Sequence, residues 1–169
     1  MREMLLVPIS QDGTFAESES LDAAFRRHQP WLVGRLTLVV RDPEEARDLA
    51  QQAFLKAAER WPIGSPDEVA RWLAVVGVRL AISEGRRRRR WGFLAVEDTD
   101  ATWAMEIDPD LWLALSGLDR RTRAALILTV VEGYTQDEVA DALGVPRGTL
   151  ASRLSRARAK LRPALEVRG

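Results

Sequence analysis

Residues 135–160 carry the pattern that most restricts the possible fold of this chain. Residues 135–138 read Thr-Gln-Asp-Glu, a capping box in which the threonine and glutamate side chains satisfy free backbone groups at a helix start. That helix is expected to end at Gly144, because glycine readily adopts the left-handed conformation that closes a helix. After the short turn at 144–146, a longer basic helix is expected from about Arg147 to Leu165. The pattern predicts a helix-turn-helix.

The two sides of the second helix of this unit differ in character. Apolar residues recur at steps of four, three and four, which predicts one buried face made of Leu150, Leu154, Ala157 and Leu161. Arginine can bind guanine in the major groove or a phosphate beside it, so the basic face predicts DNA binding. The candidate DNA-contacting residues are Arg147, Thr149, Ser152, Arg153, Ser155 and Arg156. The alternative is a plain helical hairpin whose basic face is only solvated.

Helix-start signals elsewhere predict five more helices, and no strand pattern of useful length occurs. N-capping residues, prolines in the first turn and early acids precede the apolar patterns. The predicted helices run from Leu21 to Val40, from Asp42 to about Trp61, from Pro66 into the arginine run, from Pro109 to about Ser116, and from Leu118 or Asp119 to Glu132. The sequence therefore predicts an all-α fold of two small helical domains, a three-helix domain and a helix-turn-helix domain. Their expected bounds are 20–91 and 109–169, with an N-terminal extension at 1–19 and an acidic linker at 92–108.

The charges are segregated along the chain although its net charge is zero. Residues 86–90 are five consecutive arginines, and residues 146–168 hold seven basic residues against one acid. Between these blocks, residues 92–111 hold six acids and no base. Because basic blocks attract phosphates, the arginine run beside a helix-turn-helix is predicted to be a phosphate-binding patch. A solvated helix end, favoured by the helix dipole, is the alternative for this run.

The composition restricts which kinds of site are possible. The chain has no cysteine and a single histidine, His28, which excludes thiolate metal sites and multi-histidine sites. No metal, cofactor or enzymatic activity is therefore expected, since capping and solvation explain the acids. No apolar run reaches about 18 residues and the first 20 residues lack a secretory signal, so a cytoplasmic location without membrane insertion is expected.

The helix predicted to follow Asp42 also has two contrasting sides. Its apolar positions, from Ala46 to Ala57, form one inward stripe. The opposite side carries polar groups beside an exposed leucine and consists of Asp48, Gln51, Gln52 and Leu55. Taken singly, these are ordinary surface residues.

Several stretches of the chain resemble a single known family. Residues 42–55, DPEEARDLAQQAFL, resemble its region 2.2, and Arg71-Trp72-Leu73 with the following apolar helix and arginines resembles its regions 2.3 and 2.4. Residues 133–158, from GYT to SRLSRAR, resemble its region 4.2. The stretches that resemble region 2.2 and region 4.2 stand in the family's order and separation. The family is the extracytoplasmic-function (ECF, group IV) RNA polymerase sigma factors of the sigma-70 family.

This resemblance implies a bacterial transcription initiation factor whose partners are core RNA polymerase and promoter DNA. It implies that the polymerase clamp binds Asp48, Gln51, Gln52 and Leu55. It implies that the third helix contacts the −10 element, for which the candidates are Trp72, Arg79, Arg86 and Arg87. The second domain would sit on the polymerase flap and read the −35 element, and the acidic linker would run toward the RNA-exit path. An anti-sigma factor is a further implied partner.

The chain departs from the family's usual text at a few positions. Arg79 stands where asparagine is usual, Ser83 where aspartate is usual, and Ala151 where a basic residue is frequent. Two alternative functions remain: a sigma mimic that sequesters an anti-sigma factor, and a stand-alone helix-turn-helix repressor. The first two departures favour the mimic, whereas the basic last helix argues against it. The surface of Asp48, Gln51, Gln52 and Leu55 would have no role in a repressor, which argues against that alternative.

Overall fold

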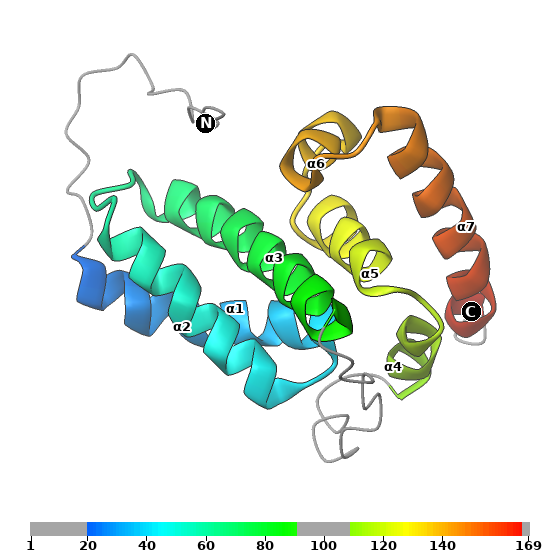
Figure 1. The fold of residues 1–169 in the computed structure, drawn as a ribbon, viewed down its shortest axis with the longest axis horizontal. Helices are drawn as coiled ribbons and strands as arrows, with labels where there is room; N and C mark the ends of the chain where they lie inside the picture. The colour runs from blue at the N-terminus through cyan, green and yellow to red at the C-terminus, as the bar shows by residue number, and fades with distance from the viewer. Residues whose placement is uncertain (1–19, 91–108, 167–169) are drawn as a thin grey trace.

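The structure, a computed structural model, describes residues 20–90 and 109–166, and every regular element in these ranges is a helix (Figure 1). The elements are α1 (Leu21–Val40), α2 (Pro43–Ala58), α3 (Pro66–Arg90), α4 (Pro109–Ser116), α5 (Arg120–Leu126), the π-helix η2 (Ile127–Val131), α6 (Gln136–Leu143) and α7 (Arg147–Glu166). The predicted all-α fold with two helical domains is confirmed. The predicted N-terminal extension and acidic linker lie outside the described residues. Within 20–90 and 109–166, no helix has the length and apolar character needed to cross a membrane.

The helix starts follow from the capping residues that the sequence places there. The Ser20 side chain accepts a hydrogen bond from the Ala23 backbone N–H at 3.2 Å, which caps α1. Asp42 accepts bonds from the N–H groups of Glu44 and Glu45 at 2.9 and 3.2 Å, which caps α2. These side chains satisfy backbone donors that have no partner inside the helix, so they fix where each helix begins.

Two helix boundaries differ from the sequence prediction. α2 ends at Ala58 rather than near Trp61, because the residue before a proline is disfavoured in helical conformation and the last turn tightens around Arg60. The helix predicted to reach Glu132 changes to a π-helix after Leu126, where the Glu132 N–H bonds to the Ile127 carbonyl at 3.0 Å. A widened turn of this kind has no signature in the apolar spacing.

The helices form two groups that pack against each other. Figure 1 shows α1, α2 and α3 on one side and α4 to α7 on the other, with α5 running beside α3. α5 contacts α1 and α3 of the first domain as well as α7 of the second. One continuous cluster of buried apolar side chains extends through both domains. The domains therefore share a packed boundary, which we call the seam.

Candidate nucleic-acid and polymerase interfaces

The helix-turn-helix forms as the sequence predicts. The Glu138 backbone N–H donates to Thr135 Oγ1 at 3.2 Å, and the Thr135 N–H donates to Glu138 Oε2 at 2.7 Å, which completes the capping box. The bonds that the Thr135 N–H and hydroxyl donate to the Glu138 carboxylate hold the pKa of Glu138 below its ordinary value. α6 ends at Gly144, whose φ of 62° lies in the left-handed region. The short turn after α6 then directs the chain into α7.

α7 has the two sides that its sequence predicts. The buried residues are Leu150, Leu154, Ala157 and Leu161. Five of the six candidate DNA-contacting residues are exposed, namely Arg147, Thr149, Ser152, Ser155 and Arg156. Arg156 Nε donates to the carbonyl of Ser152 in its own helix at 3.3 Å, and Arg147 pairs with Asp137 of α6 at 2.8 Å. Because exposed pairs contribute little stability, both guanidinium groups can exchange these contacts for DNA.

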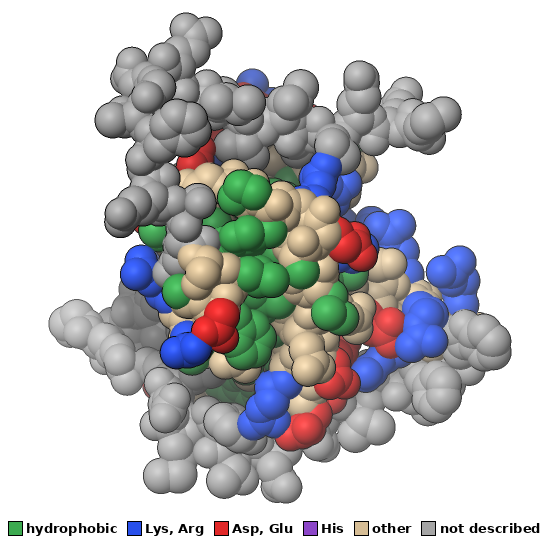
Figure 2. Space-filling view, turned by 90° about the vertical axis from the view of Figure 1, so that its left-hand side faces the viewer, with side chains coloured by type: hydrophobic (Ala, Val, Ile, Leu, Met, Phe, Trp, Pro, Cys, Tyr) green, Lys and Arg blue, Asp and Glu red, His purple; other side chains and the backbone are tan. Residues whose placement is uncertain are grey.

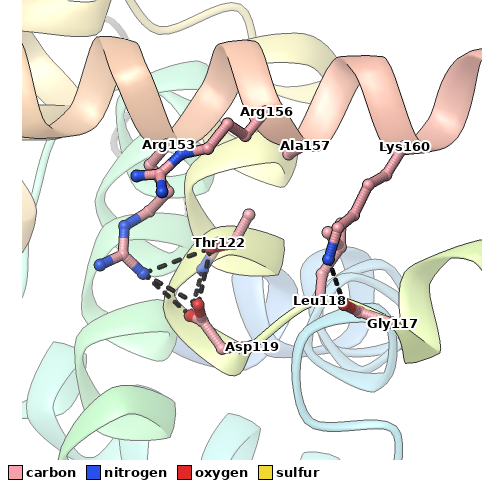
Figure 3. A pocket seen from close by; sticks show the side chains of 8 residues that line it. All are labelled: Gly117, Leu118, Asp119, Thr122, Arg153, Arg156, Ala157 and Lys160. Carbon is pink, nitrogen blue, oxygen red and sulfur yellow. Dashed lines mark hydrogen bonds and ion pairs between the residues drawn. The ribbon is translucent and has the colours of Figure 1, made fainter.

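Arg153 has different surroundings from the other five candidates (Figure 3). Its Nη1 lies 3.0 Å from both carboxylate oxygens of Asp119, at the start of α5, and 3.2 Å from Thr122 Oγ1. Burial raises the pKa of Asp119, but hydrogen bonds from Thr122 and the charge of Arg153 outweigh burial and lower it. Arg153 therefore joins α5 to α7, and a contact with DNA would compete with this joint.

A hollow of about 280 Å³ lies beside this joint. Figure 3 shows its lining between the start of α5 and one side of α7, with Lys160 reaching toward Gly117. Lys160 Nζ donates to the Gly117 carbonyl at 3.4 Å. Arg153, Arg156 and Lys160 make the lining basic. Since Arg156 also belongs to the exposed face of α7, the hollow lies at the edge of the candidate DNA surface.

The candidate polymerase surface lies on the outer side of α2. Its four residues are exposed, and Leu55 is the large apolar residue of this helix that remains exposed, at 64%. The opposite stripe is buried as predicted, from Ala46 to Ala57. Figure 2 views the end of the molecule where α2 finishes, and hydrophobic side chains gather there with charged side chains around them. An exposed leucine beside polar groups is a suitable anchor for a protein partner.

Three of the four −10 candidates lie on one side of α3. Trp72, Arg79 and Arg86 are seven residues apart, close to two helical turns. Arg79 and Arg86 are exposed, whereas Trp72 is partly buried against the core. This side of α3 therefore combines an aromatic edge with two guanidinium groups.

Arg87, the fourth candidate, is exposed and carries an internal partner. Its Nε and Nη2 donate to the two carboxylate oxygens of Glu84 at 2.8 Å each. These bonds hold the pKa of Glu84 at about 2, so Glu84 stays ionised beside the arginine run. The charge of Arg87 is thus balanced locally, and its predicted DNA contact would compete with Glu84.

The seam holds charged contacts that the sequence did not predict. Arg35 Nε donates to Glu132 Oε1 at 2.6 Å, and Arg71 Nη2 donates to Glu138 Oε1 at 3.2 Å. The Arg71 guanidinium also lies 4.2 Å from the centre of the Tyr134 ring, whose hydroxyl donates to the Arg71 carbonyl at 2.7 Å. Burial raises the pKa of Tyr134 to about 12. These partners are 63 to 97 residues apart in the chain, so no local pattern reveals them.

Arg123 of α5 is a deeply buried charged residue of the seam, with 4% of its surface exposed. Its Nε donates to the carbonyl of Val39, near the end of α1, at 2.7 Å. Its Nη1 donates to the carbonyls of Leu115 and Leu118, the former at 3.3 Å. One side chain thus satisfies backbone acceptors at the ends of helices in both domains.

Comparison with known proteins relates the chain to two sigma-70 regions. Sigma-70 region 2 matches residues 24–91, and Sigma-70, region 4 matches residues 110–161. The ECF RNA polymerase sigma factor SigE of Mycolicibacterium smegmatis is 30% identical over 162 residues, which cover 89% of this chain and 63% of SigE. The ECF RNA polymerase sigma factor SigM of Mycobacterium tuberculosis (strain ATCC 25618 / H37Rv) is 33% identical over 147 residues, which cover 84% of this chain and 75% of SigM.

A solved structure shares the fold. The sigma factor RpoE in complex with the anti-sigma factor NepR from Bartonella quintana aligns with a TM-score of 0.65 and 26% identity, over 85% of this chain and 94% of that chain. The two matched regions coincide with the two helical domains and together span more than half of the chain. The chain therefore belongs to the ECF RNA polymerase sigma factors of the sigma-70 family.

Proposed function

We propose that this protein binds core RNA polymerase and directs transcription initiation at particular promoters. The observation that carries the proposal is the pairing of two unlike surfaces on two domains. An exposed leucine among polar groups lies on α2, and an exposed basic face lies on α7. A protein contact and a DNA contact on one small chain suit a factor that brings polymerase to DNA.

In this proposal, α7 lies in the major groove at the −35 element. The middle of its exposed face, around Ser152 and Arg156, would meet base edges, because the second helix of a helix-turn-helix reads the groove. Gly148, in the first turn of α7, has open space around the position of a Cβ atom. The backbone there can approach DNA closely. Arg147 would contact a phosphate at the rim of the groove.

The first domain would bind the polymerase clamp through α2 and the −10 element through α3. Arg79 is an exposed cation on α3, so this position is expected to contact the DNA backbone rather than a base. Residues 109–166 would sit on the polymerase flap. An anti-sigma factor is proposed as a further partner, because the solved relative is a complex with one.

Promoter-specific transcription in vitro tests the proposal. The full chain is mixed with bacterial core polymerase and a library of promoter fragments, and transcripts are sequenced. We expect transcripts that start at a defined distance from shared −10 and −35 elements. A sigma mimic would yield none while retaining an anti-sigma factor, and a repressor would bind operator DNA without polymerase. Either result would overturn the proposal.

A substitution on α2 tests the assigned polymerase surface. Leu55→Asp should abolish co-purification with core polymerase while helicity measured by circular dichroism stays unchanged. Lys56→Asp is the matched control, since Lys56 is also exposed but lies about 100° away around the helix. If Leu55→Asp still co-purifies, the interface lies elsewhere.

A further inference from the structure

The first turn of α2 contains a buried carboxylate that neither interface uses. The Glu45 side chain is only 3% exposed. Arg120 of α5, in the other domain, donates from Nη1 to Glu45 Oε1 at 2.6 Å and from Nη2 to Oε2 at 3.1 Å. Arg88 of α3 lies 3.2 Å from the same Oε2. The two parallel bonds from Arg120 are the bidentate geometry in which arginine recognises carboxylates best.

A glycine in α3 makes room for the incoming arginine. A Cβ atom at Gly85 would lie 3.0 Å from Arg120 Cδ and 3.2 Å from its Nη1. Arg120 Nη1 also donates to the carbonyl of Ala81, one turn earlier in α3, at 3.0 Å. Glycine is unfavourable inside a helix, and here its missing side chain is the space that Arg120 fills. Glu45, the Ala81 carbonyl and Gly85 thus line a notch on the first domain.

This contact is better shielded from water than the other ion pairs of the seam. The Arg120 side chain is 15% exposed, whereas the Arg71 and Glu138 side chains are 50% and 47% exposed. Exposed pairs are screened and weak, while removing one partner of a buried pair leaves a costly unpaired charge. Among the described seam contacts, Arg120 in the notch is therefore an effective lock.

The closed arrangement also brings like charges together. Arg121, next to the lock, has its pKa lowered by burial and by the positive charges of Arg86, Arg153 and Arg89. Arg86 and Arg89 belong to α3, so their repulsion of Arg121 acts across the seam and favours separation of the domains, whereas Arg153 lies in the same domain as Arg121. A specific attractive contact is needed to oppose it.

We propose that Glu45, the Ala81 carbonyl and Gly85 form a guanidinium-binding site on the first domain, and that its occupation by Arg120 holds the two domains closed and must end before both promoter elements are bound. The second half of this statement rests on the proposed function. The −10 and −35 elements are about 25 base pairs apart by their names, or roughly 85 Å of duplex. Residues of α5 that pack on α1 and α3 cannot keep these contacts while the domains bind sites so far apart.

The distance between the domains in the full chain tests the first half without polymerase or DNA. Because the chain has no cysteine, Lys56→Cys and Arg158→Cys can carry a pair of spin labels with no background. Both positions are exposed, one in each domain. We expect one narrow distance distribution for the otherwise unchanged chain. Arg120→Ala should shift most molecules to longer, broader distances.

Gly85→Ala separates opening from unfolding. Alanine favours the helical conformation of α3 while its Cβ occupies the notch, so helicity should be kept and the closed population should still fall several-fold. Arg26→Ala is the control, because it breaks an exposed pair within α1 and should leave the distances unchanged. If Arg120→Ala and Gly85→Ala both retain the narrow distribution, the notch does not hold the domains together and the proposal is wrong.

Transcription tests the second half separately. Gly85→Ala should need less sigma protein than the unchanged chain for half-maximal promoter-specific transcript from a fixed amount of core polymerase. An unchanged requirement, despite open domains in the distance measurement, would show that closure does not oppose promoter binding. Absence of transcripts from the unchanged chain would instead contradict the proposed function and leave the distance result standing.

Discussion

Arg156 and Arg153 are three residues apart on α7, and their surroundings give them different expected roles. Arg156 lies in the middle of the exposed face of α7 that is proposed to contact base edges. It bonds to a carbonyl of its own helix at a long distance, 3.3 Å. We expect Arg156→Ala to cost about 1–3 kcal/mol at the preferred −35 sequence and to relax the preference at one base pair. Arg162→Ala, nearer the rear of the helix, should affect all sequences equally or not at all. Competition binding against single-base variants of the −35 element decides this, and a uniform loss for Arg156→Ala would make Arg156 a phosphate contact.

Arg153 should act mainly on stability. Removing its guanidinium deletes the bonds to Asp119 and Thr122 and should lower the free energy of unfolding by about 1 kcal/mol, a value discounted because Asp119 is more than half exposed. The folded-state pKa of Asp119 lies below its ordinary value of 3.8. Its contribution to the free energy of unfolding is therefore present above pH 3.8 and is lost as the pH falls below that value. Arg153→Ala should therefore flatten the pH dependence of thermal stability below about pH 4. An unchanged pH profile would contradict the assigned joint.

Apolar spacing was enough to predict which side of each helix is buried, but it could not predict the partners of buried charges. Leu150 and Leu154 repeat within one helix, so their burial can be read locally. Glu45 looked like a first-turn acid that favours the helix dipole, and its partner Arg120 lies 75 residues away. Gly85 was the one local signal, because a glycine just before an arginine run is out of place in a helix interior.

At the scale of elements, Gly144 at the end of α6 and Gly148 in the first turn of α7 should respond in opposite ways to alanine. Gly144 has a φ of 62°, so Gly144→Ala should destabilise the protein by about 1–2 kcal/mol although its surroundings are open. Gly148 is helical with open space around it, so Gly148→Ala should stabilise by up to about 1 kcal/mol. Thermal unfolding of both variants checks the signs. Gly148→Ala should also weaken DNA binding, because its methyl group separates the backbone from the groove.

Helix starts were easier to predict than helix ends. Ser20, Asp42 and Thr135 each accept hydrogen bonds from the first turn of their helix, so the residue type fixes the start. The end of α2 and the π-helix η2 depend on backbone bonds that many sequences can make. Val130 and Val131, at the end of η2, lie on the surface, 62% and 44% exposed.

At the scale of the whole molecule, the two domains were predictable and their closed packing was not. Each domain has its own capped, amphipathic helices, whereas the seam depends on α5 of the second domain packing against α1 and α3 of the first. Arg35, Arg71 and Arg120 all look like ordinary surface arginines in the sequence. Their partners are defined only by the three-dimensional arrangement, so a sequence pattern of period 3.6 carries no information about them.

The seam joins two units of one chain, and the same contacts can form between two chains. Arg120 of one molecule would then enter the notch of another, and reciprocal exchange would give a two-fold symmetric dimer with two seams. A covalent connection supplies an effective concentration on the order of millimolar, so exchanged dimers should be rare at micromolar protein and grow as the concentration approaches the millimolar range. Light scattering across a concentration series would detect them, and Gly85→Ala should suppress them. Overproduction of this protein would thus favour domain-exchanged dimers, and these dimers would dissociate to closed monomers on dilution.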